Sequence, residues 1–112
     1  MFLNVKLKFI TLEDLLQMRA NDEKFKLVEV LSEEEHEEGH IPGAINIPVD
    51  KLDTLARERL KKSDMIIVYC ASYHCQASTK AAKKLLEMGY DKTMDFKGGK
   101  RWWRHAGLEL EK

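Results

Sequence analysis

The segment that most constrains the fold of this chain is residues 65–69, MIIVY. Its side chains are apolar or aromatic at every position, whereas a half-buried strand would alternate apolar and polar side chains. A continuous apolar strand is typical of a parallel sheet whose two faces are both covered by helices. We therefore expect residues 65–69 to form the central strand of an α/β domain.

Strand-like and helix-like segments alternate along the whole chain, and this order also predicts an α/β sheet. The predicted strands cover residues 5–9, 26–31, 44–47, 65–69 and 92–96. The predicted helices run from Thr11 to about residue 20, from Ser32 to Gly39, over 50–62 and from the end of a polar loop to Gly89, and a last one contains the two tryptophans. Thr11 and Ser32 mark helix starts, because an acidic residue three positions later completes a capping box.

The composition limits the class of protein. A chain of 112 residues holds one hydrophobic core, so we expect a single domain over residues 1–112. No segment approaches the roughly 20 apolar residues of a membrane helix, and the N-terminus lacks a signal-peptide pattern. We therefore expect a cytoplasmic protein without a membrane partner. Basic and acidic residues number 19 each, so the net charge gives no reason to expect a nucleic-acid partner.

Cys70 directly follows the predicted central strand, and a polar loop, residues 70–76, leads from it into a helix. Ligands of open parallel sheets bind beyond the carboxyl ends of the strands. Loop N–H groups and the positive end of the helix dipole would lower the pKa of a cysteine there. With 2 cysteines in the chain, we expect a reactive or structural thiol rather than a disulfide framework. These patterns leave Cys70 open as a nucleophile or as a small buried side chain.

Residues 39–48, GHIPGAINIP, resemble the signature of rhodanese domains, which are sulfurtransferases. Residues 68–70 and 81–90 are similar to the catalytic strand and helix of that family, and residues 96–108 are similar to its closing segment. The resemblance spans nearly the whole chain, in family order. It implies a single rhodanese-like domain of the α/β class, with a sheet of about five mainly parallel strands and helices on both faces.

The same resemblance implies that Cys70 is the catalytic residue and holds sulfane sulfur as a persulfide. Thiosulfate or another small sulfane donor leaves one sulfur atom on Cys70, and a thiol, cyanide or a protein acceptor takes it away. No metal and no organic cofactor is implied. The implied active-site and substrate-binding loop consists of Ala71, Ser72, Tyr73, His74, Cys75 and Gln76.

The loop departs from the family pattern, because it contains no arginine or lysine and is longer than the common sulfurtransferase loop. Longer loops are typical of cell-division-cycle phosphatases and arsenate reductases, but those phosphatases bind phosphate with a bidentate loop arginine. Leu31 and Glu29 also stand where the family usually has an arginine and an aspartate. We therefore do not expect thiosulfate to be the preferred donor. The candidates to supply positive charge beside the loop are Lys97, Lys100 and Arg101.

Cys75 is a candidate resolving thiol, which would attack a persulfide on Cys70 and leave a disulfide. The alternative is a structural residue at a helix start. Tyr73 and His74 are candidates to line the site, without an assigned catalytic role. Three functions stay open: a sulfurtransferase or sulfur carrier, a rhodanese-like interaction module without chemistry, and a dithiol redox protein or arsenate reductase that uses both cysteines.

Residues 36–40, HEEGH, match the H-E-x-x-H pattern of zinc metalloproteases. That pattern needs both histidines on one face of a continuous helix, and Gly39 and Pro42 interrupt the helix here. We therefore expect no metal site, and we expect His40 to bond to the backbone. Adjacent tryptophans cannot face the same way, so Trp103 is expected in the core and Trp102 at the surface.

Overall fold

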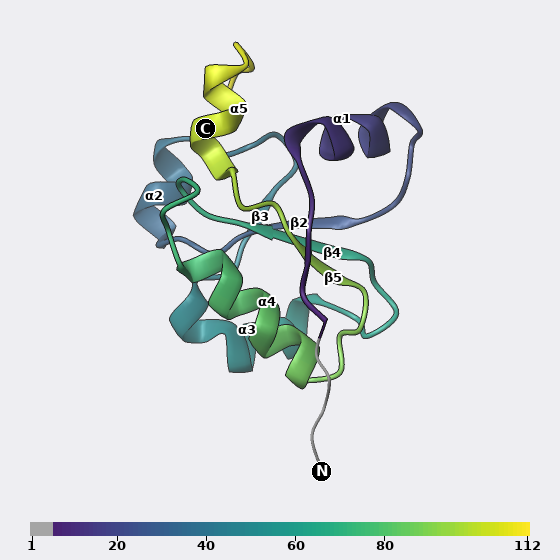
Figure 1. Ribbon diagram of the computed structural model, residues 1–112. Helices are drawn as coiled ribbons and strands as arrows, with labels where there is room; N and C mark the ends of the chain where they lie inside the picture. Colours follow the sequence, from purple (N-terminus) through teal and green to yellow (C-terminus); the bar gives the residue numbers. More distant parts are fainter. Residues whose placement is uncertain (1–5) are drawn as a thin grey trace.

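The computed structural model describes residues 6–112. Its strands are β1 (Lys8–Phe9), β2 (Lys26–Glu29), β3 (Ile45–Asn46), β4 (Ile66–Tyr69) and β5 (Thr93–Asp95). Its helices are α1 (Leu12–Ala20), α2 (Glu33–Glu38), the 3₁₀ turn η1 (Val49–Lys51), α3 (Leu52–Arg59), α4 (Ala77–Glu87) and α5 (Gly99–His105). The strands form one five-stranded sheet in the order β1-β5-β4-β2-β3, and every neighbouring pair is parallel (Figure 1). The predicted α/β sheet is confirmed.

The central strand β4 is buried along its whole length, as its apolar sequence predicted. Ile66 and Val68 pack with residues of α3 and α4, whereas Ile67 and Tyr69 pack with residues of α1 and α5. Helices therefore cover both faces of the sheet (Figure 1). Each fully buried aliphatic side chain contributes about 1.5–3 kcal/mol to stability. This burial holds the end of β4, and with it Cys70, in a fixed place.

The helix ends follow the capping signals of the sequence. At α1, the Asp14 N–H donates to the Thr11 hydroxyl at 3.0 Å, and the Thr11 N–H donates to the Asp14 carboxylate at 2.9 Å. Ser32 and Glu35 form the same capping box at α2. Gly89 follows α4 with a φ of +99°, a left-handed conformation that glycine adopts without strain. The predicted helix starts and the predicted stop at Gly89 are confirmed.

Several elements are shorter than predicted. The predicted helix over 50–62 is present, but it divides into η1 and α3 and ends at Arg59, three residues earlier than predicted. The Asp64 carboxylate accepts a hydrogen bond from the Lys61 N–H at 2.8 Å, and this turn leads the chain into β4. The described part of the first predicted strand is reduced to β1, an edge strand that pairs on one side, and Val5 lies outside the described residues.

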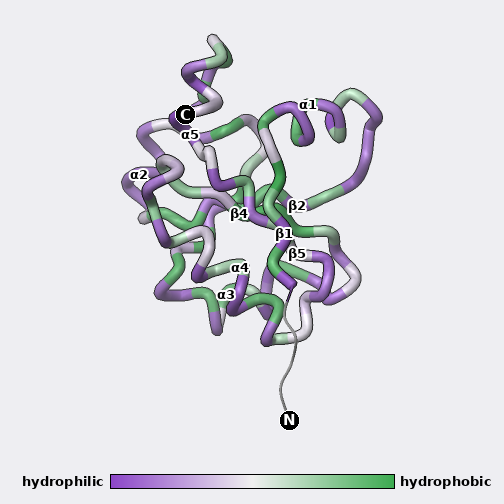
Figure 2. Tube along the Cα trace, viewed as in Figure 1, coloured by the Kyte–Doolittle hydropathy of each residue, from purple (hydrophilic) through white to green (hydrophobic). Residues whose placement is uncertain are grey.

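Apolar residues are frequent in the strands at the centre of the molecule, and polar residues are frequent in the helices and loops around them (Figure 2). Trp103 is buried and Trp102 is 52% exposed, as predicted. Within residues 6–112, no helix is both long enough and apolar enough to cross a membrane. The core therefore lies on the two faces of the sheet. The carboxyl end of β4 leads from this core into the loop that follows the strand.

Candidate active site

Cys70 directly follows β4, at the carboxyl end of the central strand, as predicted. Its side chain is fully buried, with 0% of its surface exposed. The loop 70–76 then leads into α4. The first turn of α5 packs against the start of this loop, because the Lys100 N–H donates to the Cys70 carbonyl at 3.0 Å and the Arg101 N–H donates to the Ala71 carbonyl at 2.9 Å. Helix α5 therefore fixes the backbone of the candidate nucleophile.

Gly99, the first residue of α5, permits this close approach. Its φ is +61°, and a Cβ atom at this position would collide with the carbonyl oxygen of Cys70. A larger residue would be strained at this φ and would push α5 away from the loop. The contact of Gly99 with Cys70 was not predicted from the sequence, in which Gly98 and Gly99 form a pair just before the last predicted helix. The available signal was the glycine pair itself, since glycine often marks a place where two backbones approach closely.

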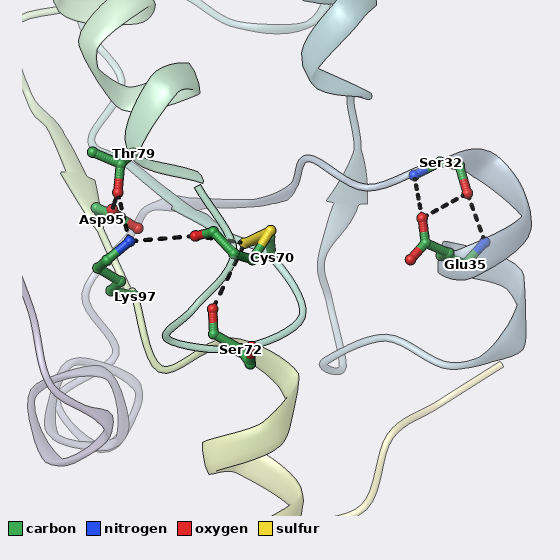
Figure 3. The surroundings of a disulfide bond; sticks show 8 residues. Ser32, Glu35, Cys70, Ser72, Thr79, Asp95 and Lys97 are labelled. Carbon is green, nitrogen blue, oxygen red and sulfur yellow. Dashed lines mark hydrogen bonds between the residues drawn. A yellow bond between two sulfur atoms is a disulfide. The ribbon is translucent and has the colours of Figure 1, made fainter. Parts of the chain in front are cut away.

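Cys70 and Cys75 form a disulfide that closes the loop (Figure 3). The Cys75 N–H donates to the Ser72 carbonyl at 3.0 Å, and this turn brings the two cysteine Cα atoms to 6.4 Å, a usual separation for a disulfide. The expected Cys70 thiolate surrounded by N–H groups belongs to the reduced protein, so it stays a prediction. The Cys70 sulfur instead contacts the carbonyl oxygens of Cys75 at 3.5 Å and Ser72 at 3.9 Å, because a disulfide sulfur has no charge for N–H groups to stabilise.

The other loop residues lie around this disulfide, and most of them face solvent. Tyr73 is 60% exposed, and the His74 ring meets it edge-on with 6.4 Å between ring centres. Gln76 is the N-cap residue of α4 but makes no side-chain hydrogen bond there. Ala71 is exposed and Ser72 is half-buried. The structure thus brings all the predicted loop residues together at one edge of the sheet.

Within residues 6–112, three cavities have loop residues in their walls; one of them, of about 670 Å³, includes only Ala71 of the loop, and the other two are as follows. The first has a volume of about 890 Å³, is mostly apolar and includes Tyr73 and Trp102 in its walls, so Tyr73 lines a pocket as the sequence analysis suggested. The second has a volume of about 510 Å³ and places Arg101 and Arg104 beside Ser72. The second cavity therefore suits a small anion, and the first suits an apolar group.

Lys97 lies on the α4 side of the loop (Figure 3). Its ammonium donates hydrogen bonds to the Thr79 hydroxyl at 3.0 Å and to the Cys75 carbonyl at 3.3 Å, and it lies 5.5 Å from the centre of the Tyr73 ring. The Thr79 hydroxyl in turn donates to the Asp95 carboxylate at 2.9 Å. Burial raises the pKa of Asp95 above its ordinary value. The predicted position of Lys97 beside the loop is confirmed.

Lys100 also contacts the loop through its backbone N–H, but its ammonium is paired with a carboxylate inside the protein. Its ammonium lies 3.0 Å from the Glu29 carboxylate and donates to the Glu35 carbonyl at 2.8 Å. Glu29 is fully buried, at 0% exposure, and its other carboxylate oxygen accepts a hydrogen bond from the Tyr69 hydroxyl at 2.6 Å. The suggestion that Lys100 supplies free positive charge to the loop is therefore wrong, because a buried carboxylate neutralises it.

Titratable side chains surround Glu29, and the sequence analysis missed this group. His36 Nδ1 lies 3.6 Å from the Glu29 carboxylate, and burial lowers the pKa of His36 below its ordinary value. Burial also raises the pKa of Tyr69 well above its usual range. The signal in the sequence was Glu29 itself, a charged residue in the apolar strand segment LVEVL, because a buried charge needs a partner.

The two histidines of the HEEGH segment stack on each other. The rings of His36 and His40 lie 3.8 Å apart between centres, at an angle of 8°. His40 Nδ1 lies 2.8 Å from the His36 carbonyl oxygen, which confirms the predicted bond to the backbone, and Nε2 lies 3.3 Å from the Glu111 carboxylate. Helix α2 ends at Glu38 and Gly39 caps it, so the histidines share no continuous helix. Among the described residues, no group of three or more His, Cys, Asp or Glu side chains is arranged to hold a metal ion.

Several known proteins are similar to this chain. The HTH-type transcriptional regulator Rv0324 of Mycobacterium tuberculosis is 37% identical over 103 residues, which cover 91% of this chain and 44% of that protein. The putative sulfur carrier protein YrkF of Bacillus subtilis is 33% identical over 94 residues, which cover 84% of this chain and 49% of that protein. A sulfurtransferase of Allochromatium vinosum is 30% identical over 98 residues, which cover 88% of this chain and 89% of that protein. The chain thus spans less than half of the first two relatives.

Solved structures share the fold. The BH2092 protein of Bacillus halodurans superposes with a TM-score of 0.84 and 33% identity, over 93% of this chain and 76% of that chain. The human single-domain sulfurtransferase TSTD1 superposes with a TM-score of 0.77 and 24% identity, over 89% of this chain and 97% of that chain. The family model of the rhodanese-like domain matches residues 11–106, so the predicted extent 1–112 stays a prediction. By this match and by its fold, the chain belongs to the rhodanese-like domain family.

Proposed function

We propose that this domain transfers sulfane sulfur through a persulfide on Cys70, as a sulfurtransferase or sulfur carrier. The observation that carries the proposal is the position of Cys70 at the carboxyl end of the central strand, with its carbonyl bound by α5. Helix α4 begins just beyond the loop, and the positive end of its dipole favours an anionic sulfur. Relatives named as a putative sulfur carrier and as a sulfurtransferase support the same chemistry.

The transfer takes two displacements at sulfur. In the reduced protein, the Cys70 thiolate attacks the sulfane sulfur of a small donor, such as thiosulfate or a low-molecular-weight persulfide. The sulfur–sulfur bond of the donor breaks, and sulfite or a thiolate leaves. A thiol, cyanide or a protein thiol then attacks the outer sulfur of the persulfide, and the Cys70 thiolate leaves. A cysteine of low pKa serves both steps, as attacking group and as leaving group.

A dithiol redox function is the second candidate, and the disulfide between Cys70 and Cys75 favours it. Such a function needs both cysteines, because the protein cycles between dithiol and disulfide. Sulfur transfer to an acceptor needs Cys70 alone. An interaction module without chemistry needs neither thiol, so the requirement for each cysteine distinguishes the three functions.

Thiocyanate formation from a sulfane donor and cyanide tests the proposal. The reduced wild type is compared with Cys70→Ser and Cys75→Ser, with thiosulfate and with glutathione persulfide as donors. We expect turnover by the wild type and by Cys75→Ser, and none by Cys70→Ser. Loss of turnover in both variants would favour a dithiol mechanism. No turnover by the wild type with either donor would exclude sulfur transfer and would leave the dithiol redox function and the interaction module.

A further inference from the structure

We propose that Cys75 is a resolving thiol that displaces the outer sulfur of a Cys70 persulfide and releases it as hydrogen sulfide. The inference rests on the proposed persulfide and adds a second fate for its sulfur. Transfer gives the sulfur to an acceptor, whereas resolution makes the domain a reductase of small sulfane donors. The structure holds the protein product of this step, the Cys70–Cys75 disulfide.

Two secondary-structure elements place the cysteines opposite each other. Cys70 directly follows β4, and Cys75 directly precedes the N-cap residue of α4. The hydrogen bond from the Cys75 N–H to the Ser72 carbonyl, at 3.0 Å, turns the loop back on itself. Because the two Cα atoms are 6.4 Å apart, the sulfur atoms bond without any movement of β4 or α4. A Cys75 thiolate therefore reaches the Cys70 sulfur within the folded protein.

Two sources of positive charge lie beside Cys75, the start of helix α4 and the Lys97 ammonium. Helix α4 has 11 residues, no acidic residue in its first turn and no side-chain cap from Gln76, so its positive end is available to an anion at Cys75. The Lys97 ammonium brings a positive charge to the same place through its 3.3 Å hydrogen bond to the Cys75 carbonyl. Cys75 is half-buried whereas Cys70 is fully buried, so a small reductant reaches the disulfide from the Cys75 side.

The step is a thiol–disulfide exchange within one chain. The Cys75 thiolate attacks Sγ of Cys70, and a bond forms between the two Sγ atoms. The bond from Sγ of Cys70 to the outer sulfur breaks, and its electron pair leaves with that sulfur as HS⁻, which takes a proton from water. The two cysteine sulfurs are oxidised and the sulfane sulfur is reduced to sulfide. Two molecules of a small thiol, or one dithiol, then reduce the disulfide and become a disulfide themselves.

Attack by Cys75 on the outer sulfur is the competing step. It would move the sulfur to Cys75 as a second persulfide, without release of sulfide and without change in the mass of the protein. The structure joins the two Sγ atoms directly, so Sγ of Cys70 is the atom within reach of Cys75. Resolution, rather than relay to Cys75, is therefore the step that this loop favours.

The experiment follows one round of loading by intact mass and by sulfide release. Reduced wild type, Cys70→Ser, Cys75→Ser and Cys75→Ala are treated with glutathione persulfide, freed from the donor by rapid desalting, and incubated without thiol or acceptor. Circular dichroism confirms that each variant is folded. Intact mass spectrometry then gives the state of the protein over time, and a fluorogenic alkylating reagent traps the sulfide.

We expect both Cys75 variants to keep the mass of one added sulfur atom. The wild type should lose that mass together with two hydrogens, and should release one sulfide per loaded chain. A wild-type persulfide that lasts as long as that of Cys75→Ser, or one that peptide mapping finds on Cys75, overturns the resolving role and leaves sulfur transfer standing. If the folded Cys75 variants take up no sulfur at all, the persulfide itself fails, and the resolving role fails with it.

Discussion

The backbone N–H of Lys100 donates a hydrogen bond to the carbonyl oxygen of Cys70 at 3.0 Å. The side chain of the same lysine lies 3.0 Å from the carboxylate of Glu29, which is fully buried. One residue thus connects the loop 70–76 to an ion pair inside the protein. The backbone position of the candidate nucleophile is therefore coupled to that ion pair.

Replacement of Lys100 by methionine removes the cation that pairs with Glu29 and keeps a side chain of similar length. Because the buried Glu29 carboxylate then loses its cation and keeps only the Tyr69 hydroxyl and His36 beside it, we expect the free energy of unfolding to fall by about 3 kcal/mol. Urea unfolding followed by tryptophan fluorescence measures the change. The double variant Glu29→Gln with Lys100→Met should recover part of the loss, since it buries no charge. A loss below about 1 kcal/mol in Lys100→Met would mean that the pair behaves like an exposed one.

Gly99→Ala and Gly107→Ala separate backbone strain from a collision with Cys70. Both glycines have a positive φ, +61° and +82°, but a Cβ atom at Gly107 meets nothing within 4 Å whereas one at Gly99 meets the Cys70 carbonyl. Gly107→Ala should cost about 1 kcal/mol of stability, the strain of a left-handed residue. Gly99→Ala should cost clearly more and should slow the loading of sulfur onto Cys70. Equal losses of stability and equal loading rates in the two variants would refute the close approach.

His36 predicts a pH dependence of stability. Burial lowers its pKa below the ordinary value of 6.5, so in mildly acidic solution the unfolded chain binds a proton that the folded chain does not bind. The contribution of His36 to stability is therefore fully present above pH 6.5 and is lost as the pH falls below that value. Urea unfolding over a pH series gives the free energy of unfolding as a function of pH. Below pH 6.5 this free energy should fall less steeply for His36→Asn than for the wild type. His105→Asn, at an exposed position of α5, is the control, and equal slopes for all three proteins would contradict this role of His36.

Lys97 and Arg101 should control the use of anionic donors. Lys97 bonds to the Cys75 carbonyl, and Arg101 lines the cavity beside Ser72. Replacement of both by glutamine should raise the KM for thiosulfate several-fold at low ionic strength and should weaken its dependence on salt, because salt screens the attraction. A neutral organic polysulfide should be affected less, and Lys80→Gln, at an exposed position of α4, should have little effect. Unchanged thiosulfate kinetics in the Lys97/Arg101 variant would contradict the role of these two residues in attracting anionic donors.

The position of Cys70 could be predicted from the sequence because its signals are local. An unbroken apolar segment over 65–69 is compatible with a strand covered on both faces, and the residue after it must lie at the sheet edge. Thr11 and Ser32 bond to residues three positions away, so their helix starts are equally visible. The GHIPGAINIP segment is contiguous as well.

The contacts that shape the loop could not be predicted in this way. Glu29 and Lys100 come from distant parts of the chain, and their pairing depends on how β2 and α5 lie in the folded protein. The spacing of Cys70 and Cys75 suits many loop conformations, and the turn at Ser72 decides that the sulfur atoms meet. Helix α3 ends before residue 62 because the chain turns there. The Lys61 N–H donates to the Asp64 carboxylate in this turn, which leads into β4. Each of these features is a tertiary contact rather than a local preference.

The most direct test of sulfur transfer through Cys70 is the intact mass of reduced Cys75→Ser before and after reaction with a sulfane donor, followed by addition of cyanide. In this variant, resolution by the second thiol cannot compete with the persulfide. We predict a gain of one sulfur atom, its removal by cyanide as thiocyanate, and no gain when Cys70 is also replaced by serine. No gain with either thiosulfate or glutathione persulfide, or a gain that survives the loss of Cys70, would contradict this prediction.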